Sequence, residues 1–204
     1  MILYVSTRSS SLAARLAFAL AGNPGEVKEL GLRAGEHLTE EYRAINPKGE
    51  VPALVLDNGQ TLTETPAILL ALGEMFPQTG LIPTEQLARW RVMEWLSWYA
   101  WQMPRCFQPA FMPGMFGPAP AENQIRVAAM ARIEKLLTFL EHSLEGRDFA
   151  VGDNLTAADL VIVMVTIFTG FVGMVPPDAL MAHRARIFAL PALTDTLKAE
   201  GFAA

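Results

Sequence analysis

Polar side chains stand at two places where the sequence predicts the start of a helix. Ser9-Ser10-Ser11 follows a short apolar run, Met1 to Val5, and Thr63-Glu64-Thr65-Pro66 opens a second apolar helical pattern. The first turn of a helix leaves backbone N–H groups without partners, and its dipole favours negative charge, so hydroxyls there suit an anionic group. The same hydroxyls can also serve only as helix caps. The two roles are compatible, and both segments are candidates for binding.

A third segment stands out because a proline directly precedes a predicted central strand. The stretch from Asn46 to Leu54 contains Val51-Pro52 just before the apolar run Ala53 to Leu56. A proline cannot donate a hydrogen bond to a sheet, so this position is awkward unless its peptide bond has a special role. A cis Val51-Pro52 bond would supply that role, although only about 5% of X-Pro bonds in folded proteins are cis.

The elements that must position these residues are predicted in the order βαβ followed by ββα. Asn58-Gly59 is a strong hairpin signal between the last two strands, and parallel pairing in the first half requires the intervening helix. This order is typical of an α/β thioredoxin-like N-terminal domain. The expected strands are Met1 to Val5, Glu26 to Leu30, Ala53 to Leu56 and Gln60 to Leu62, and the expected helices end near Gly22, Ala44 and Met75.

Composition changes after the last of these helices. Two prolines and a glycine lie between Phe76 and Pro83, and only helical patterns follow. We therefore expect residues 1–77 to form the first domain, 78–84 a linker and 85–204 an all-α C-terminal domain. Its expected helices are Glu85 to Phe111, Ala121 to Leu144, Thr156 to Phe171 and Pro191 to Glu200.

The segment from Asn46 to Leu54, with Glu64-Thr65-Pro66 following it, closely resembles the cytosolic glutathione transferases, and the resemblance covers nearly the whole chain. It implies that glutathione is the co-substrate and that Val51, next to Pro52, pairs through its main chain with the cysteinyl unit of glutathione. Glu64 would accept from the γ-glutamyl ammonium, and Thr65 would hold the γ-glutamyl carboxylate. The implied binding set also includes Glu50 and Arg33. The lysine that the beta class uses near the glycine carboxylate falls close to Arg33 or Ala34, so Arg33 is a candidate substitute, and a solvated surface arginine is the alternative interpretation.

Among bacterial classes the chain looks most like the beta class, which places a cysteine where this chain has Ser10 and a histidine where it has Pro104. A serine cannot form a mixed disulfide with glutathione, so hydroxyl assistance is expected instead. A free thiol with a pKa of ~8.5 is only ~3% thiolate at pH 7, and a pKa lower by ~2 units would make it mostly thiolate. Ser9, Ser10 and Ser11 are all candidates for that hydroxyl.

The second substrate would meet apolar residues of the first helix of the helical domain. Met103, Pro104, Phe107 and Phe111 are the candidates for this pocket, and a small apolar electrophile is the expected substrate. Packing in the core or in a dimer interface is the alternative interpretation, and it is favoured for the four tryptophans of the same helix. Cys106 could face the cleft, although buried free cysteines are common.

Bulk properties exclude several other classes of function. A net charge of -5 without runs of Lys or Arg predicts no nucleic-acid partner and no membrane partner. One cysteine and three histidines without ligand spacing predict neither a disulfide nor a metal site, and they suit a reducing compartment, the cytoplasm. The apolar runs Leu12 to Ala21 and Leu160 to Val175 are predicted to be helices packed in a core, not a signal peptide or a membrane span.

Three functions remain open from the sequence. The first is a detoxifying transferase, a homodimer by resemblance, which adds the glutathione thiolate to an electrophile. The second is a glutathione-dependent isomerase, because Arg8-Ser9-Ser10-Ser11 partly echoes the opening of the zeta class. The third is a non-catalytic glutathione-binding or interaction protein of the same fold.

Overall fold

The computed structural model describes residues 1–202, which form two compact units. The first unit contains Met1–Ile82 together with the chain from Phe188 onward, and the second contains Pro83–Ile187. The thioredoxin-like N-terminal domain and the all-helical region that follows it are both confirmed.

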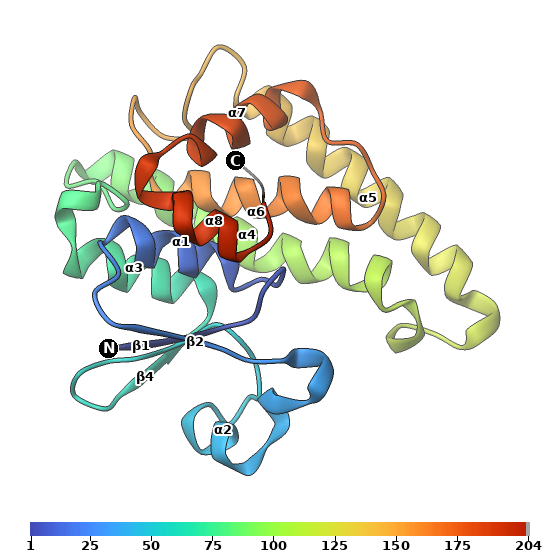
Figure 1. Ribbon diagram of the computed structural model, residues 1–204. Helices are drawn as coiled ribbons and strands as arrows, with labels where there is room; N and C mark the ends of the chain where they lie inside the picture. Colours follow the sequence, from blue (N-terminus) through green and yellow to red (C-terminus); the bar gives the residue numbers. More distant parts are fainter. Residues whose placement is uncertain (203–204) are drawn as a thin grey trace. The chain divides into compact units, whose positions relative to one another are not determined.

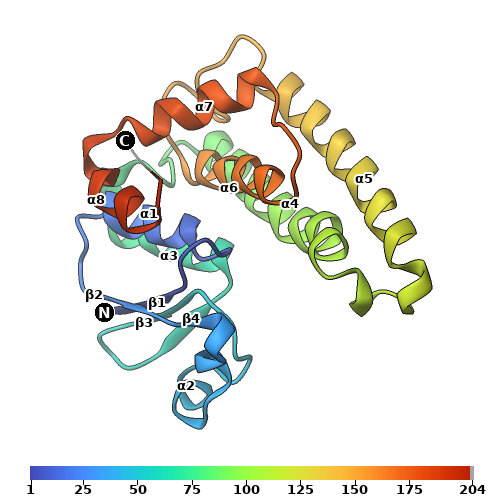
Figure 2. The same cartoon turned by 45° about the vertical axis from the view of Figure 1, so that its right-hand side comes forward.

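The first unit is built on a four-stranded mixed sheet in the order β2-β1-β3-β4 (Figures 1 and 2). Strand β1 pairs in parallel with β2, while the pairs β1 with β3 and β3 with β4 are antiparallel. The parallel pair is connected by helix α1, as parallel strands require. The elements are β1 (Ile2–Val5), α1 (Leu12–Leu20), β2 (Glu26–Glu29), α2 (Glu40–Ile45), β3 (Ala53–Val55), β4 (Thr61–Thr63) and α3 (Thr65–Met75).

The two faces of the sheet are covered by different helices. Helices α1 and α3 lie over one face and α2 lies on the other side (Figures 1 and 2). Side chains alternate along β1, so Leu3 and Val5 are fully buried on one face, whereas Tyr4 packs with Ala53 and with Tyr42 of α2 on the other. The rings of Tyr4 and Tyr42 lie 5.4 Å apart, which fixes α2 and the loop after it against the sheet.

The end of the chain returns to the first unit. A 3-10 turn (Pro191–Leu193) and helix α8 (Thr194–Ala199) contact α1, with Leu193 fully buried and Leu197 nearly so. The sequence assigned this segment to the helical domain, because its pattern is helical. The structure instead groups it with the sheet unit, because its apolar side chains cover α1.

The second unit consists of four helices, α4 (Gln86–Phe111), α5 (Glu122–Ser143), α6 (Ala157–Phe171) and α7 (Asp178–Phe188). Helix α6 is buried along nearly its whole length, which explains its continuous apolar sequence. Within residues 1–202, no helix is both long and apolar enough to cross a bilayer.

Three of the four helices match their expected ranges within one or two residues, but α7 was not predicted. Its sequence carries two arginines and a histidine beside its apolar positions, so its helical period is weak. Helix α4 runs through Pro104 and Pro109 without ending. Glu85 caps its start, with its carboxylate accepting the N–H groups of Leu87 and Ala88 at 3.0 and 2.6 Å.

Candidate active site

The turn between β1 and α1 holds the three candidate serines in different environments. The hydroxyls of Ser9 and Ser11 lie 2.7 Å apart, and both lie within 3.1 Å of the Ser6 carbonyl oxygen. Ser11 Oγ also accepts the Ser6 N–H at 3.0 Å and is fully buried. Ser11, the N-cap residue of α1, makes no side-chain cap bond because its hydroxyl turns back to Ser6, so the expected capping role is wrong for Ser11. Ser9 Oγ accepts the Ser11 N–H at 3.2 Å. Ser9 and Ser11 thus close the turn.

Ser10 differs because its hydroxyl points to another predicted site residue. Its Oγ lies 3.4 Å from the carbonyl oxygen of Val51, and its own carbonyl accepts the Thr65 hydroxyl at 3.3 Å. The Val51-Pro52 peptide bond is cis. Both contacts are longer than a typical O–H···O hydrogen bond, so the Ser10 hydroxyl can turn to a better acceptor at little cost. The first unit therefore brings Ser10, Val51 and Thr65 together.

The loop that presents Val51 is held by two side chains on the carbonyl of Glu50. Tyr42 Oη donates to this oxygen at 2.6 Å and Asn46 Nδ2 donates to it at 2.7 Å. Asn46 Oδ1 also accepts the Lys48 N–H at 3.2 Å, which closes the loop from inside. Burial raises the pKa of Tyr42, with the hydrogen bond to Asn46 acting in the opposite direction. The sequence had not assigned these supporting roles, although Asn46 opens the motif.

Glu64 combines an unusual backbone with an ion pair that the sequence did not predict. Its φ is 71°, in the left-handed region that non-glycine residues rarely adopt, directly before α3. Its Oε1 lies 2.5 Å from Lys48 Nζ, which also donates to Thr63 Oγ1 at 2.9 Å. Both charged side chains are at least half exposed, so this pair contributes little stability, ~0–1 kcal/mol. A ligand ammonium could replace Lys48 at this carboxylate.

Thr65 is the first residue of α3 and is nearly buried. The carboxylate of Glu64, the residue before it, makes no side-chain cap bond to the first turn of α3. Such a helix start favours a carboxylate ligand. Of the other two predicted glutathione contacts, Arg33 is exposed on a short 3-10 turn (Leu32–Ala34), and Glu50, next to Val51 in the chain, has an exposed side chain.

The residues predicted for the second-substrate pocket lie on α4 in the helical unit. Met103 and Phe107 are buried, Pro104 is exposed, and Phe111 is 39% exposed. The Phe107 ring lies 5.9 Å from the ring of Phe168 on α6, and the Phe111 ring lies 5.7 Å from it. These aromatic contacts make Phe107 part of the core of this unit. Of the four predicted pocket residues, Phe111 and Pro104 are the more accessible.

Cys106, the only thiol in the chain, is also buried on α4. Its Sγ lies 3.7 Å from Gln102 Oε1. Burial raises the pKa of this thiol, and the nearby guanidinium groups of Arg105 and Arg132 offset the rise only in part. A thiol with a raised pKa is a poor nucleophile at neutral pH.

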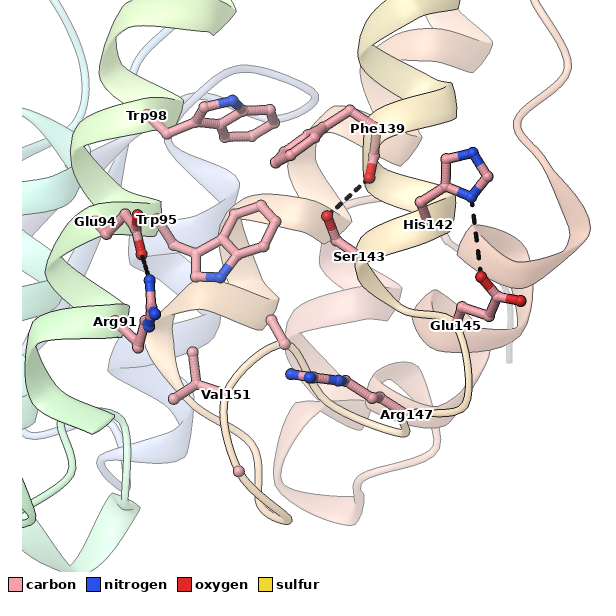
Figure 3. Close-up of a pocket in the computed structure, with 12 residues that line it drawn as sticks. Arg91, Glu94, Trp95, Trp98, Phe139, His142, Ser143, Glu145, Arg147 and Val151 are labelled. Atoms are coloured by element: carbon pink, nitrogen blue, oxygen red, sulfur yellow. Dashed lines mark hydrogen bonds and ion pairs between the residues drawn. The ribbon is translucent and has the colours of Figure 1, made fainter. Parts of the chain in front are cut away.

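A cavity of about 660 Å³ lies between α4, α5 and the loop after α5 (Figure 3). Its aromatic wall is formed by Trp95, Trp98 and Phe139, with ring centroids 5.3 to 5.8 Å apart. The ion pair of Arg91 with Glu94 (2.8 Å) and the contact of His142 Nδ1 with Glu145 Oε2 (3.9 Å) lie at its edge. None of the residues predicted to act on a substrate lines it.

No cluster of three or more His, Cys, Asp or Glu side chains that could ligate a metal occurs in residues 1–202.

Comparison with known proteins shows the family of the chain. Residues 9–75 match the family model of the glutathione S-transferase N-terminal domain, and residues 104–191 match that of the C-terminal domain. The glutathione S-transferase GstA of Escherichia coli O157:H7 is 30% identical over 165 residues, which cover 79% of each chain. Glutathione S-transferase theta-1 of Rattus norvegicus is 34% identical over 79% of this chain and 70% of its own.

Solved structures give the same result over the full length. A sphingomonad glutathione S-transferase complexed with glutathione is 34% identical, covers 100% of both chains and superposes with a TM-score of 0.85. A bacterial beta class glutathione S-transferase from Sphingomonas chungbukensis is 30% identical over 100% of both chains, with a TM-score of 0.86. The chain therefore belongs to the glutathione S-transferase family.

Proposed function

We propose that this protein binds glutathione on its first unit and adds the glutathione thiolate to a small apolar electrophile. The observation that carries this proposal is the convergence of Ser10, Val51 and Thr65, through contacts of 3.4 and 3.3 Å. Three residues far apart in the sequence, each assigned to a different part of the tripeptide, meet in one place. A relative that is 34% identical over its full length has been solved with glutathione bound, which supports the same ligand here.

In the proposed complex each end of glutathione has its own partner. The main chain of Val51, before Pro52, pairs with the cysteinyl unit as an added strand would. The γ-glutamyl ammonium displaces Lys48 from Glu64, at little cost because that pair is exposed. The γ-glutamyl carboxylate takes the Thr65 hydroxyl and the N–H groups at the start of α3. Arg33 and Glu50 remain candidates near the glycine end.

Ser10 is the proposed catalytic residue, because Ser9 and Ser11 already close the turn with their hydroxyls. Its hydroxyl leaves the Val51 carbonyl and donates to the glutathione sulfur, which stabilises the thiolate together with the start of α1. The thiolate then forms a bond to the electrophilic carbon. In a substitution the leaving group departs with its electron pair, and in a conjugate addition the product carbanion takes a proton from water.

The finer properties of the protein belong to the same proposal. The electrophile is proposed to contact Met103, Pro104, Phe107 and Phe111, with Phe111 and Pro104 as the more accessible residues. Trp90 on α4 is 57% exposed and Phe139 on α5 is 47% exposed, which supports a homodimer that covers them. A cytoplasmic location is proposed from the single cysteine, which suits a reducing compartment, and a detoxifying role from the resemblance.

Glutathione binding and thiolate formation can be tested separately. Immobilised glutathione captures the protein, and ultraviolet difference spectra against pH report the thiol pKa of bound glutathione in the wild type and in Ser10→Ala. The proposal expects a wild-type pKa lowered by ~2 units and a rise of at least ~1 unit in Ser10→Ala. Ser97→Ala is the matched control, because that hydroxyl caps a carbonyl within α4 and lies outside the proposed site.

Each negative result removes a different part of the proposal. Failure of the wild type to bind glutathione at millimolar concentration would rule out every glutathione-dependent function. Binding without a thiolate band, and without turnover on a panel of electrophiles, would identify a non-catalytic binding protein. A lowered pKa that survives in Ser10→Ala would transfer the role to Ser9, Ser11 or backbone amides.

A further inference from the structure

A buried carboxylate from the far end of the chain contacts the serine turn. The side chain of Glu200, directly after α8, is 0% exposed, and its Oε2 accepts the backbone N–H of Arg8 at 2.8 Å. Its other oxygen, Oε1, accepts from the guanidinium of Arg15 on α1 at 2.7 Å. Glu200 therefore connects the turn, the helix that follows the turn and the end of the chain.

A second carboxylate holds the preceding residue of the same turn. Glu29, at the end of β2, accepts from both the N–H and the hydroxyl of Thr7, and its Oε2 lies 3.8 Å from the same Arg15 guanidinium. Two consecutive backbone N–H groups, of Thr7 and Arg8, are thus held by two carboxylates that share one arginine. No sequence pattern indicates this arrangement, because Arg8 and Glu200 are 192 positions apart.

The backbone of Arg8 needs such support. Its φ is 58°, a left-handed conformation that a residue with a Cβ rarely adopts and that persists only when its surroundings hold it. Ser10 follows two residues later, so a change at Arg8 would swing the Ser10 hydroxyl away from its position. Small displacements of a catalytic group cost large factors in rate.

The chemistry of the contact argues against a purely stabilising role. A buried ion pair contributes little net stability compared with apolar side chains of the same size, because both charges lose their hydration. An apolar residue at position 200 would fill the same space but could not accept the Arg8 N–H. The carboxylate is thus suited to fixing one backbone conformation of the turn.

We propose that Glu200 is a positioning residue for glutathione activation, which holds the Arg8 N–H so that the Ser10 hydroxyl meets the thiol. The inference rests on the proposed function, in which Ser10 stabilises the thiolate. Glu200 does not touch glutathione in this account. It acts through the backbone of the turn.

Two double variants isolate this hydrogen bond from the charges. Arg15→Met with Glu200→Gln and Arg15→Met with Glu200→Met both remove the ion pair and leave no unpaired buried charge. They differ in one respect, since only the glutamine retains an oxygen that can accept the Arg8 N–H. The measurement is the thiol pKa of bound glutathione, from ultraviolet difference spectra against pH.

We expect the Met/Gln variant to keep a lowered thiol pKa and the Met/Met variant to show a value higher by about 1 unit, with the loss of kcat exceeding any change in KM. Equal thiol pKa values in the two folded variants would overturn the proposal. If Glu200 acted only through its charge, the two variants would show equal thiol pKa values, because both carry the same charge.

A single variant covers the case in which the Met/Met protein does not fold. Glu200→Asp keeps the charge but withdraws the carboxylate by one methylene, so a raised thiol pKa is expected and an unchanged value would count against the proposal. The wild-type spectrum distinguishes failure of the proposed function from failure of this inference. In that case the wild type itself shows no thiolate band, whereas failure of this inference alone leaves the wild-type band in place.

Discussion

A hydroxyl stabilises a thiolate only if its own hydrogen bonds leave its proton available. Of the three consecutive serines, Ser9 and Ser11 are within hydrogen-bond distance of each other and of Ser6, whereas Ser10 has a single long contact to Val51. The residue types therefore do not distinguish the three, but their hydrogen-bond partners do. The same comparison applies to Glu64, whose exposed partner Lys48 can be displaced by a ligand.

Cys106 offers a prediction at the residue scale, because burial raises its thiol pKa. A raised pKa leaves less than the ~3% thiolate of an ordinary cysteine at pH 7, because the thiolate fraction falls about tenfold for each unit that the pH lies below the pKa. Iodoacetamide should therefore alkylate the folded protein more slowly than the urea-unfolded chain at pH 7.

Oxidised glutathione should leave the intact mass of the folded protein unchanged, and the Cys106→Ser variant is the blank for this measurement. A stoichiometric glutathione adduct on the wild type would show that Cys106 carries thiol chemistry.

At the scale of elements, prediction succeeded where a period or a terminal signal was strong. The hairpin at Asn58-Gly59 and the starts of α3 and α6 lie within two residues of their expected places. Prediction from the sequence failed where a helix is stabilised by residues that are distant in the sequence. Helix α7 has a weak period of its own, yet its His183 is buried against Asp159 of α6 at 2.9 Å. A single sequence does not show such a contact.

The start of α6 depends on one buried carboxylate, which gives a prediction for this element. Asp159 accepts from the N–H groups of Ala150 and Thr156 at 2.7 Å each, from the Thr156 hydroxyl at 3.0 Å, and contacts His183 Nε2. Asp159→Ala leaves these buried groups without a partner, so we expect unfolding free energy to fall by about 3 kcal/mol in urea titrations. Exposed Asp153→Ala is the control. A loss below ~1 kcal/mol would mean that water replaces the carboxylate.

The molecule as a whole is organised discontinuously, which sequence patterning did not indicate. A helical pattern at the end of the chain suggested the helical domain, whereas the structure packs Leu193 and Leu197 with the first unit. Composition changes locate a boundary between neighbouring segments, near Ile82, but they do not show that a later segment returns. The proposed positioning role of Glu200 depends on this return.

Substitution of Leu193 tests this organisation directly. Its side chain is fully buried on a turn that contacts α1, so Leu193→Ala should lower stability by ~2–4 kcal/mol and speed amide exchange in α1. Leu137→Ala on α5, also a buried leucine, is the matched control and should speed exchange mainly within α4 and α5. Hydrogen exchange with mass spectrometry resolves the two patterns. If Leu193→Ala accelerated exchange in α5 while α1 stayed protected, the last segment would belong energetically to the helical unit, as its sequence pattern had suggested.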